Sequence, residues 1–320
     1  MSERLAADVT FLAARYQALR DAVGRVVVGQ EAAFRLGFAT LLCSGHSLLE
    51  GVPGVAKTLL VQSLAASVDV RFGRVQFTPD LMPSDIVGTA VLDPRERDTH
   101  FRSGPLFTDL LLADEINRAS AKTQAALLEA MQERAATVDG RRHPLGPHFA
   151  VFATQNPVEH EGTYPLPEAQ LDRFLFKIVV DYPSEAEERA ILALHHDDAP
   201  EATPPTPVLR ADELDACRTV VRAVIVRDEV VAYVAALVRA TRADLHFALG
   251  ASPRAGVMLL RAAKAHAAIE GRDYVLPEDV QAVLFPTLRH RVQLDPAAEV
   301  EGLTPDQALE ATLRSVAVPR

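Results

Sequence analysis

The sequence lacks paired cysteines, long apolar runs and an excess of positive charge. Its two cysteines, Cys43 and Cys217, lie far apart without a CxxC partner, so we expect buried free thiols in a reducing compartment. No uninterrupted apolar stretch approaches the ~20 residues that a membrane-spanning helix needs. A net charge of −10 argues against sequence-independent nucleic-acid binding, which relies on Lys and Arg to neutralise phosphates. The charged N-terminal segment is unlike a signal peptide, and we therefore expect a cytoplasmic protein without membrane insertion.

A glycine-rich segment between a short apolar run and a helical pattern is the most informative feature that is present. Its residues are Gly51, Val52, Pro53, Gly54, Val55, Ala56, Lys57 and Thr58. Such a loop at a helix N-terminus presents backbone N–H groups to phosphates. Lys57 is predicted to reach the β- and γ-phosphates of the ligand, and Thr58 to bind Mg²⁺. The general pattern has glycine where this chain has Ala56, which requires only that position 56 avoid a left-handed backbone.

Buried strands alternate with helical patterns over the first part of the chain. This alternation predicts an α/β fold, with a parallel sheet, helices on both faces and ligands at the carboxyl ends of the strands. The predicted strands are Ser47–Glu50, Arg74–Phe77, Leu110–Asp114, Phe149–Thr154 and Phe174–Val180.

Beyond Pro183 we expect helices and no strands. A Pro-rich polar segment at 197–209 predicts a linker between an α/β domain at 1–196 and a small all-α lid domain at 210–320. Two polar segments, Thr89–Arg102 and Thr137–His143, are predicted to be β-hairpin inserts, the second because of its Asp-Gly pair. The basic Leu288–Arg291 motif is interpreted as a solvated face.

Polar residues end two of the predicted buried strands. Asp114 and Glu115 follow Leu110–Ala113, and a buried carboxylate favours a Mg²⁺–phosphate neighbour because an unpaired buried charge is costly. We predict that Asp114 holds the Mg²⁺ and that Glu115 polarises an attacking water. Asn156 ends the next strand and is predicted to orient that water.

Taken together, these segments resemble AAA+ ATPases, and their amino-acid sequences are most similar to those of the MoxR family. The resemblance extends over nearly the whole chain and includes the alanine at position 56. The matching segments are Gly51–Thr58, Phe77–Gly88, Ala113–Ala119, Ala153–Pro157 and Leu166–Phe174.

The resemblance implies a homo-oligomeric ring, commonly a hexamer, that binds ATP at each subunit boundary. It implies that Arg173 is an arginine finger reaching a neighbour's γ-phosphate, with Arg118 as the alternative, and that Arg254 is a lid arginine contacting the phosphates. It also implies that Gly29 and Gln30 pack against the adenine, and that the two inserts face the pore or the ring surface.

The predicted function is therefore Mg²⁺-dependent ATP hydrolysis coupled to remodelling, maturation or metal-cofactor activation of partner proteins. Through the resemblance, the expected partner carries a von Willebrand factor A domain. Two alternatives stay open: a motor of another AAA+ branch, chelatase-like or DNA-acting, and a nucleotide-switched scaffold that hydrolyses poorly. The acidic charge balance disfavours a DNA motor.

Overall fold

The computed structural model describes residues 2–93, 98–157, 163–195 and 205–319. They form two compact units. The first, here called the α/β unit, consists of Leu19–Arg173 and Ile178–Ala211. The second, here called the helical unit, consists of Met1–Ala18, Phe174–Lys177 and Asp212–Arg320. The predicted domain limits stay a prediction, and most of the predicted linker lies outside the described residues.

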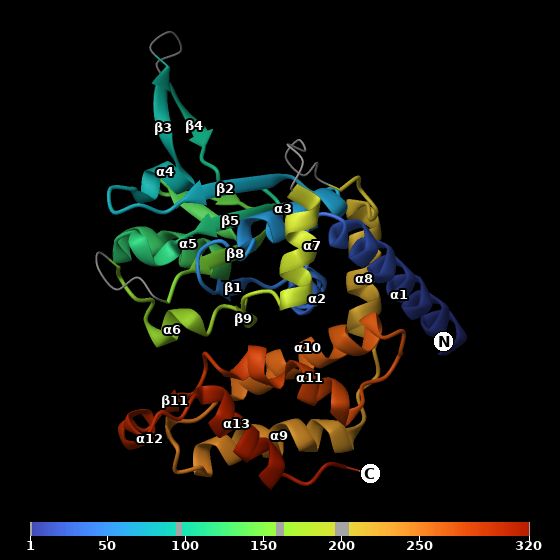
Figure 1. Ribbon diagram of the computed structural model, residues 1–320. Coiled ribbons are helices and arrows are strands. Elements are labelled where there is room, and N and C mark those ends of the chain that lie inside the picture. Colours follow the sequence, from blue (N-terminus) through green and yellow to red (C-terminus); the bar gives the residue numbers. More distant parts are fainter. Residues whose placement is uncertain (1, 94–97, 158–162, 196–204, 320) are drawn as a thin grey trace. The chain divides into compact units, whose positions relative to one another are not determined.

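A five-stranded sheet forms the centre of the α/β unit, in the order β2-β5-β8-β1-β9 (Figure 1). Neighbouring pairs β2–β5, β5–β8 and β1–β8 are parallel, which confirms the predicted sheet. Every residue of β5 is buried, as its continuous apolar sequence predicts. Because the strands are parallel, the ends of β1, β5 and β8 lie at one edge of the sheet. The strands are β1 (Ser47–Glu50), β2 (Phe72–Gln76), β5 (Leu110–Asp114), β8 (Ala150–Gln155) and β9 (Phe176–Val179).

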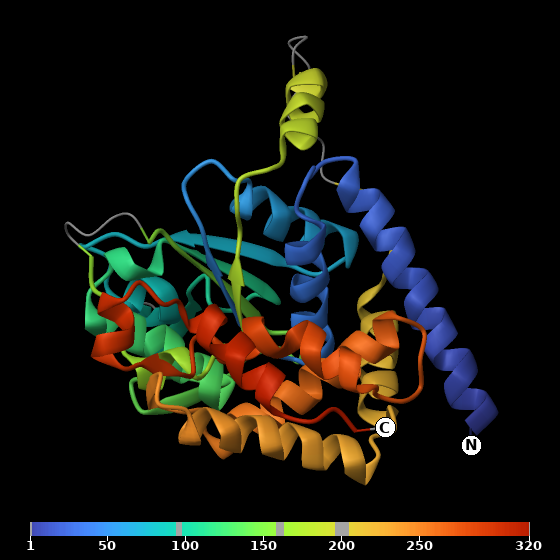
Figure 2. The ribbon, with the colours of Figure 1, turned by 60° about the horizontal axis from the view of Figure 1, so that its bottom comes forward.

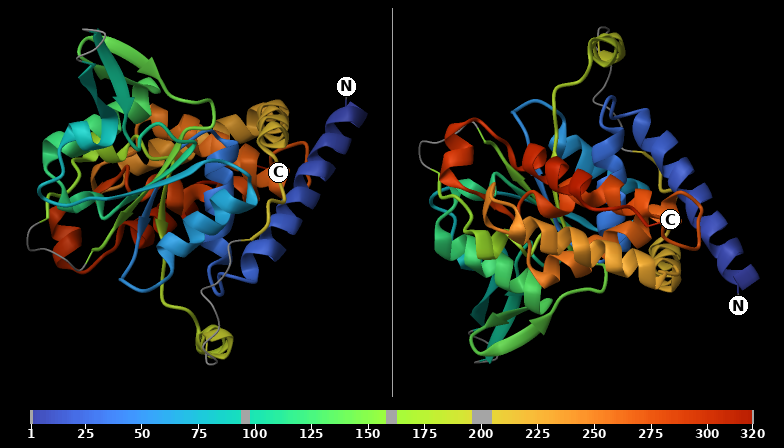
Figure 3. Two further views of the ribbon diagram at one scale, coloured as in Figure 1. Left: turned by 90° about the horizontal axis from the view of Figure 1, so that it is seen from above. Right: turned by 90° about the horizontal axis from the view of Figure 1, so that it is seen from below.

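Helices cover both faces of this sheet. Helices α2 and α3 pack on each other, as do α4 and α5, and Figure 3 shows the two pairs on opposite faces. Helix α5 begins at a Ser120 cap, whose side chain accepts a hydrogen bond from the Thr123 N–H. The helices are α2 (Glu31–Leu42), α3 (Lys57–Ser67), α4 (Pro83–Val87), the 3₁₀ turn η1 (Ile116–Arg118), α5 (Ala121–Glu133), α6 (Glu168–Leu171) and α7 (Glu185–His195).

Both predicted hairpins are confirmed. Strands β3 (Gly88–Asp93) and β4 (Asp98–Ser103) pair antiparallel, and the chain between them lies outside the described residues. Strands β6 (Ala135–Val138) and β7 (Arg141–Pro144) are joined by Asp139-Gly140, both with positive φ, as a two-residue hairpin turn requires. Figure 3 shows the hairpins side by side, and the ring of Phe101 stacks on His143 at a centroid distance of 3.9 Å.

The helical unit is a bundle in which α9, α10, α11 and α13 pack on one another, drawn in orange to red in Figure 2. Alanines pack closely along α10, where Ala262 and Ala263 are fully buried. Helix α11 is capped at its start by Asp279, which accepts hydrogen bonds from the Leu276 N–H, Arg272 and His266. The helices that lie wholly or mostly in this unit are α1 (Ser2–Gly24), α8 (Ala211–Ala223), α9 (Asp228–Ala243), α10 (Pro253–Ile269), α11 (Pro277–Leu288), α12 (Pro296–Val300) and α13 (Pro305–Ser315).

Two predictions about this unit are wrong. It contains strands, because β10 (Phe247–Leu249) pairs antiparallel with β11 (Gln293–Leu294). These strands are too short to carry a periodic pattern, and only the fold brings them together. The Leu288–Arg291 motif is also not a solvated face, because His290 is only 7% and Arg291 only 8% exposed. Both side chains donate to backbone carbonyls of the Phe174–Lys177 segment.

None of the helices in the described part of the chain is long and apolar enough to cross a lipid bilayer. Among the same residues, no group of three His, Cys, Asp or Glu side chains is arranged to hold a metal ion. Both cysteines are buried and neither forms a disulfide within the described residues, as predicted.

Candidate functional site

The glycine-rich loop leaves the end of β1 and enters α3, as the sequence predicts. Gly51 has no room for a side chain, since a Cβ there would lie 2.3 Å from the Val180 carbonyl oxygen. This contact holds the start of the loop against the chain that follows β9. Gly54 has φ +86°, a conformation that glycine adopts without cost.

Ala56 contradicts the expectation made for it. It caps α3 with φ 59° and ψ 24°, in the left-handed region. An alanine in that region costs on the order of 1–2 kcal/mol, because its Cβ approaches the carbonyl oxygen. The loop therefore keeps the backbone shape that glycine would give, and this chain carries the strain of an alanine within it.

Lys57 lies at the first position of α3, and its ammonium group turns back onto the loop. The Nζ atom donates to the Val52 carbonyl at 2.8 Å and also to the Gly51 carbonyl. Burial lowers the pKa of Lys57, while the nearby carboxylates of Asp114 and Glu115 oppose that shift. The lysine is thus within electrostatic reach of the acidic end of β5, as expected for two parts of one site.

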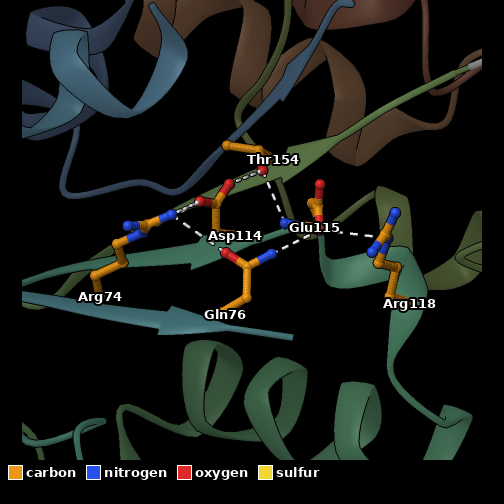
Figure 4. Close-up of polar contacts among 6 residues, drawn as sticks. All are labelled: Arg74, Gln76, Asp114, Glu115, Arg118 and Thr154. Carbon is orange, nitrogen blue, oxygen red and sulfur yellow. Dashed lines mark hydrogen bonds and ion pairs between the residues drawn. The ribbon is translucent and has the colours of Figure 1, made fainter. Parts of the chain in front are cut away.

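The acidic strand end is organised by Thr154 at the end of β8 (Figure 4). The Thr154 hydroxyl donates to Asp114 Oδ1 at 2.6 Å and accepts from the Glu115 N–H at 2.8 Å. Asp114 is 8% exposed, and Glu115 has a left-handed backbone with φ 55°. This backbone turns the chain sharply after β5, so that the two adjacent carboxylates have different surroundings.

Three further side chains that the sequence did not single out for this arrangement contact the carboxylates (Figure 4). Arg74 of β2 donates to Asp114 Oδ2 at 2.7 Å, and Gln76 of β2 donates to Glu115 Oε2 at 2.6 Å. Arg118 of η1 lies 3.2 Å from the same Glu115 oxygen. Positions 74 and 76 lie on the same face of a strand that pairs with β5. Two polar residues at this spacing in the sequence could have indicated that both side chains face the site.

The remaining predicted site residues are placed as follows. Asn156 comes directly after β8 and is 6% exposed. Arg173 precedes β9, and its Nη1 atom donates to the Leu128 carbonyl of α5. Arg254 lies in the first turn of α10 and is exposed, within the helical unit.

Gly29 and Gln30 line a cavity of about 570 Å³ in the α/β unit. Its apolar lining includes Val27, Phe34 and Leu60. The Gln30 side-chain amide donates to the Asp181 carbonyl at 3.3 Å. Leu60 belongs to α3, the helix that begins at the glycine-rich loop, so the cavity and the loop share an element.

A parallel α/β sheet with this loop, an acidic strand end and a following helical unit defines the AAA+ class of ATPases. Residues 46–176 match the family model described as ATPase family associated with various cellular activities (AAA), and residues 239–312 match the AAA lid domain. The chain belongs to the MoxR family of AAA+ ATPases.

Two relatives whose names contain MoxR, and one solved structure, support this assignment. The chain is 45% identical to Chaperone MoxR1 of Mycobacterium tuberculosis, over 93% of this chain and 81% of that protein. It is 35% identical to Protein MoxR of Paracoccus denitrificans, over 96% and 97% of the two chains. The crystal structure of an ATPase candidate from Cytophaga hutchinsonii is similar with a TM-score of 0.90 and 39% identity, covering 98% of each chain.

Proposed function

We propose that this protein hydrolyses Mg·ATP at the boundaries between subunits of a ring and so remodels, matures or activates partner proteins in the manner of a chaperone. The observation that carries the proposal is the meeting of three elements at one sheet edge. Lys57 of the loop is in the electrostatic field of Asp114 and Glu115, and Thr154 holds both acidic residues.

The loop and the acidic strand end are suited to hold the nucleotide. Lys57 would leave the Gly51 and Val52 carbonyls and bind the phosphates, a charge-assisted contact. The Thr58 hydroxyl and the Asp114 carboxylate are hard oxygen donors of the kind that Mg²⁺ prefers, so these residues fit the ion. Mg²⁺ would neutralise charge on the β- and γ-phosphates. The cavity at Gly29 and Gln30 supports an adenine site.

Glu115 is the proposed general base. In this structure its Oε2 atom is held by Gln76 and Arg118, and releasing it would free a carboxylate to accept a proton from water. Asn156 would hydrogen-bond the same water and fix its direction. These two residues then determine whether bound ATP is hydrolysed.

Completion of the site by a neighbouring subunit is part of the proposal. Arg173 would supply a guanidinium to the γ-phosphate of the neighbour, with Arg118 as the alternative. Arg254 would contact the phosphates from the lid. The ring, commonly hexameric, rests on the family resemblance.

The partner proteins also rest on the family. One relative is named a chaperone, and this supports remodelling, maturation or metal-cofactor activation of a client, which we propose carries a von Willebrand factor A domain. We further propose a cytoplasmic location, which the two reduced thiols support. The alternatives are chelatase-like or DNA-acting motors and a nucleotide-switched scaffold that hydrolyses poorly, and the following experiment tests hydrolysis against the scaffold.

The Glu115→Gln variant tests the proposal, because it removes the base and keeps the shape. We expect nucleotide binding close to that of the wild type and a loss of turnover of at least about a hundredfold, the range for a general base. Glu299→Gln, an exposed substitution in the helical unit, is the control and should turn over normally. Full turnover by Glu115→Gln would refute the role of Glu115, and no turnover by the wild type would favour the scaffold.

A further inference from the structure

The Leu288–Arg291 motif, at the junction of α11 and the chain that follows, holds the backbone just before β9. Arg291 Nη1 donates to the Leu175 carbonyl at 3.1 Å, and Arg291 Nη2 donates to the Phe174 carbonyl. His290 Nε2 lies 3.0 Å from the same Phe174 oxygen. Both lone pairs of that oxygen are therefore engaged by side chains of the helical unit.

The charge states of His290 and Arg291 suit donation to carbonyl oxygens. Burial lowers the pKa of His290 well below its usual range, and the neighbouring Arg291 adds to this shift. The imidazole is therefore neutral, and its Nε2 carries the proton that the Phe174 carbonyl accepts. Arg291 stays charged, and a buried guanidinium is tolerated only where its N–H groups are satisfied. Its contacts with consecutive carbonyls restrain the orientation of the peptide that joins Phe174 to Leu175.

The held segment is attached directly to the proposed arginine finger. Phe174–Lys177 packs with the helical unit, while Arg173, one peptide bond earlier, packs with the α/β unit. The Arg173 side chain is anchored there, on the Leu128 carbonyl of α5. The backbone position of Arg173 is thus restrained by a peptide whose carbonyl belongs to the Arg291 and His290 contacts.

We propose that Arg291 and His290 are positioning residues for Arg173, which they act on through the Phe174 carbonyl. The inference rests on the proposed function, in which Arg173 serves the ATP site of a neighbouring subunit. It implies that a chain without these contacts has a sound ATP site of its own and a misplaced finger. A displacement near 1 Å lowers the rate by about tenfold to a hundredfold when the group must meet a transition state.

Experiments with mixed rings distinguish a defect in the arginine finger, which serves the neighbouring subunit, from a defect in the ATP site of the same subunit. Arg291→Met keeps the aliphatic stem and removes the donors, and alone it should lose about tenfold or more in turnover while its affinity for a fluorescent ATP analogue stays unchanged. Mixed in equal amounts with Glu115→Gln, it should recover about one quarter of wild-type turnover, because a random ring pairs a sound site with a sound finger at that frequency. Mixed with Arg173→Ala, it should recover none.

The opposite pattern would overturn the inference. Recovery with Arg173→Ala and none with Glu115→Gln would place the defect of Arg291→Met in its own ATP site. Unchanged turnover by Arg291→Met alone would refute positioning outright. Absence of turnover in the wild type would instead refute the proposed function, and the inference with it.

Two further comparisons guard against a general loss of stability. Arg272→Met removes another guanidinium of the helical unit, one that binds Asp279, and should leave turnover per folded protein unchanged. If Arg291→Met does not fold, two variants of His290 can replace it in the same mixing experiments. His290→Gln keeps an N–H donor for the Phe174 carbonyl and should retain turnover, whereas His290→Leu should behave as a finger mutant. Equal turnover by both His290 variants would contradict the proposal.

Discussion

Replacing Ala56 by glycine should stabilise the protein, which is the reverse of what glycine usually does at a helix. The left-handed backbone of Ala56, φ 59°, costs an alanine about 1–2 kcal/mol. Glycine removes that strain, but its greater conformational freedom in the unfolded chain lowers the free energy of unfolding by about 0.4–1 kcal/mol. The expected net effect on the free energy of unfolding is a gain of about 0.8 kcal/mol.

A second alanine-to-glycine substitution, at an ordinary helical position, should change the free energy of unfolding in the opposite direction. Ala126 is half-buried in the middle of α5, where Ala126→Gly should lower the free energy of unfolding by about 1 kcal/mol. Urea unfolding followed by far-UV circular dichroism suits both variants, because the chain has no tryptophan. Ala56→Gly should move the midpoint to higher urea and Ala126→Gly to lower urea. A downward shift of similar size in both would show that Ala56 carries no strain.

Three other substitutions have predictable outcomes. Lys57→Ala should weaken binding of a fluorescent ATP analogue by about tenfold to a hundredfold, the loss of a charge-assisted hydrogen bond; equal binding would exclude a phosphate contact. Arg74→Met should lower the Mg²⁺ concentration needed for half-maximal nucleotide binding by about threefold, because a half-exposed arginine no longer competes for Asp114; an increase would show that Arg74 assists Mg²⁺ binding. Asp279→Asn should destabilise the helical unit by about 3 kcal/mol at pH 7; a constant deficit down to pH 3 would contradict its pH dependence.

That pH dependence follows from the surroundings of Asp279. Burial raises its pKa, but hydrogen bonds donated by Arg272 and His266 outweigh burial, and the pKa is lowered overall. The carboxylate therefore contributes stability above its unfolded value of about 3.9, and this contribution is lost as the pH falls through the lower folded pKa. The wild type should lose its advantage over Asp279→Asn in acid, measured as the difference in unfolding midpoint between pH 7 and pH 3.

Local patterns predicted the α/β unit well. The strand at Leu110–Asp114 and the loop before α3 were correctly placed, because a continuous apolar run and a glycine-rich turn each have few structural solutions. The Asp-Gly pair likewise predicted the β6–β7 turn. In the helical unit, pairing between β10 and β11 joins segments far apart in the chain, and no local signal describes such a contact.

Within the site, the sequence identified residues by type and order along the chain, and the fold determined what each one touches. Arg74 and Gln76 became partners of the carboxylates only because β2 lies beside β5. The basic motif at Leu288–Arg291 was misread as solvated, because charge alone favours water and only packing supplies buried carbonyls to satisfy it.

The sequence by itself determined the class of the protein and its family, and it predicted the loop, acidic strand end and amide of the proposed site. These follow from short motifs whose chemistry depends on neighbours in the chain. Only the tertiary structure decided that Ala56 adopts a left-handed backbone, that Gln76 and Arg118 hold Glu115, and that Arg291 holds the peptide after Arg173. Backbone strain and long-range hydrogen bonds depend on which distant segments meet, and that is a property of the folded chain.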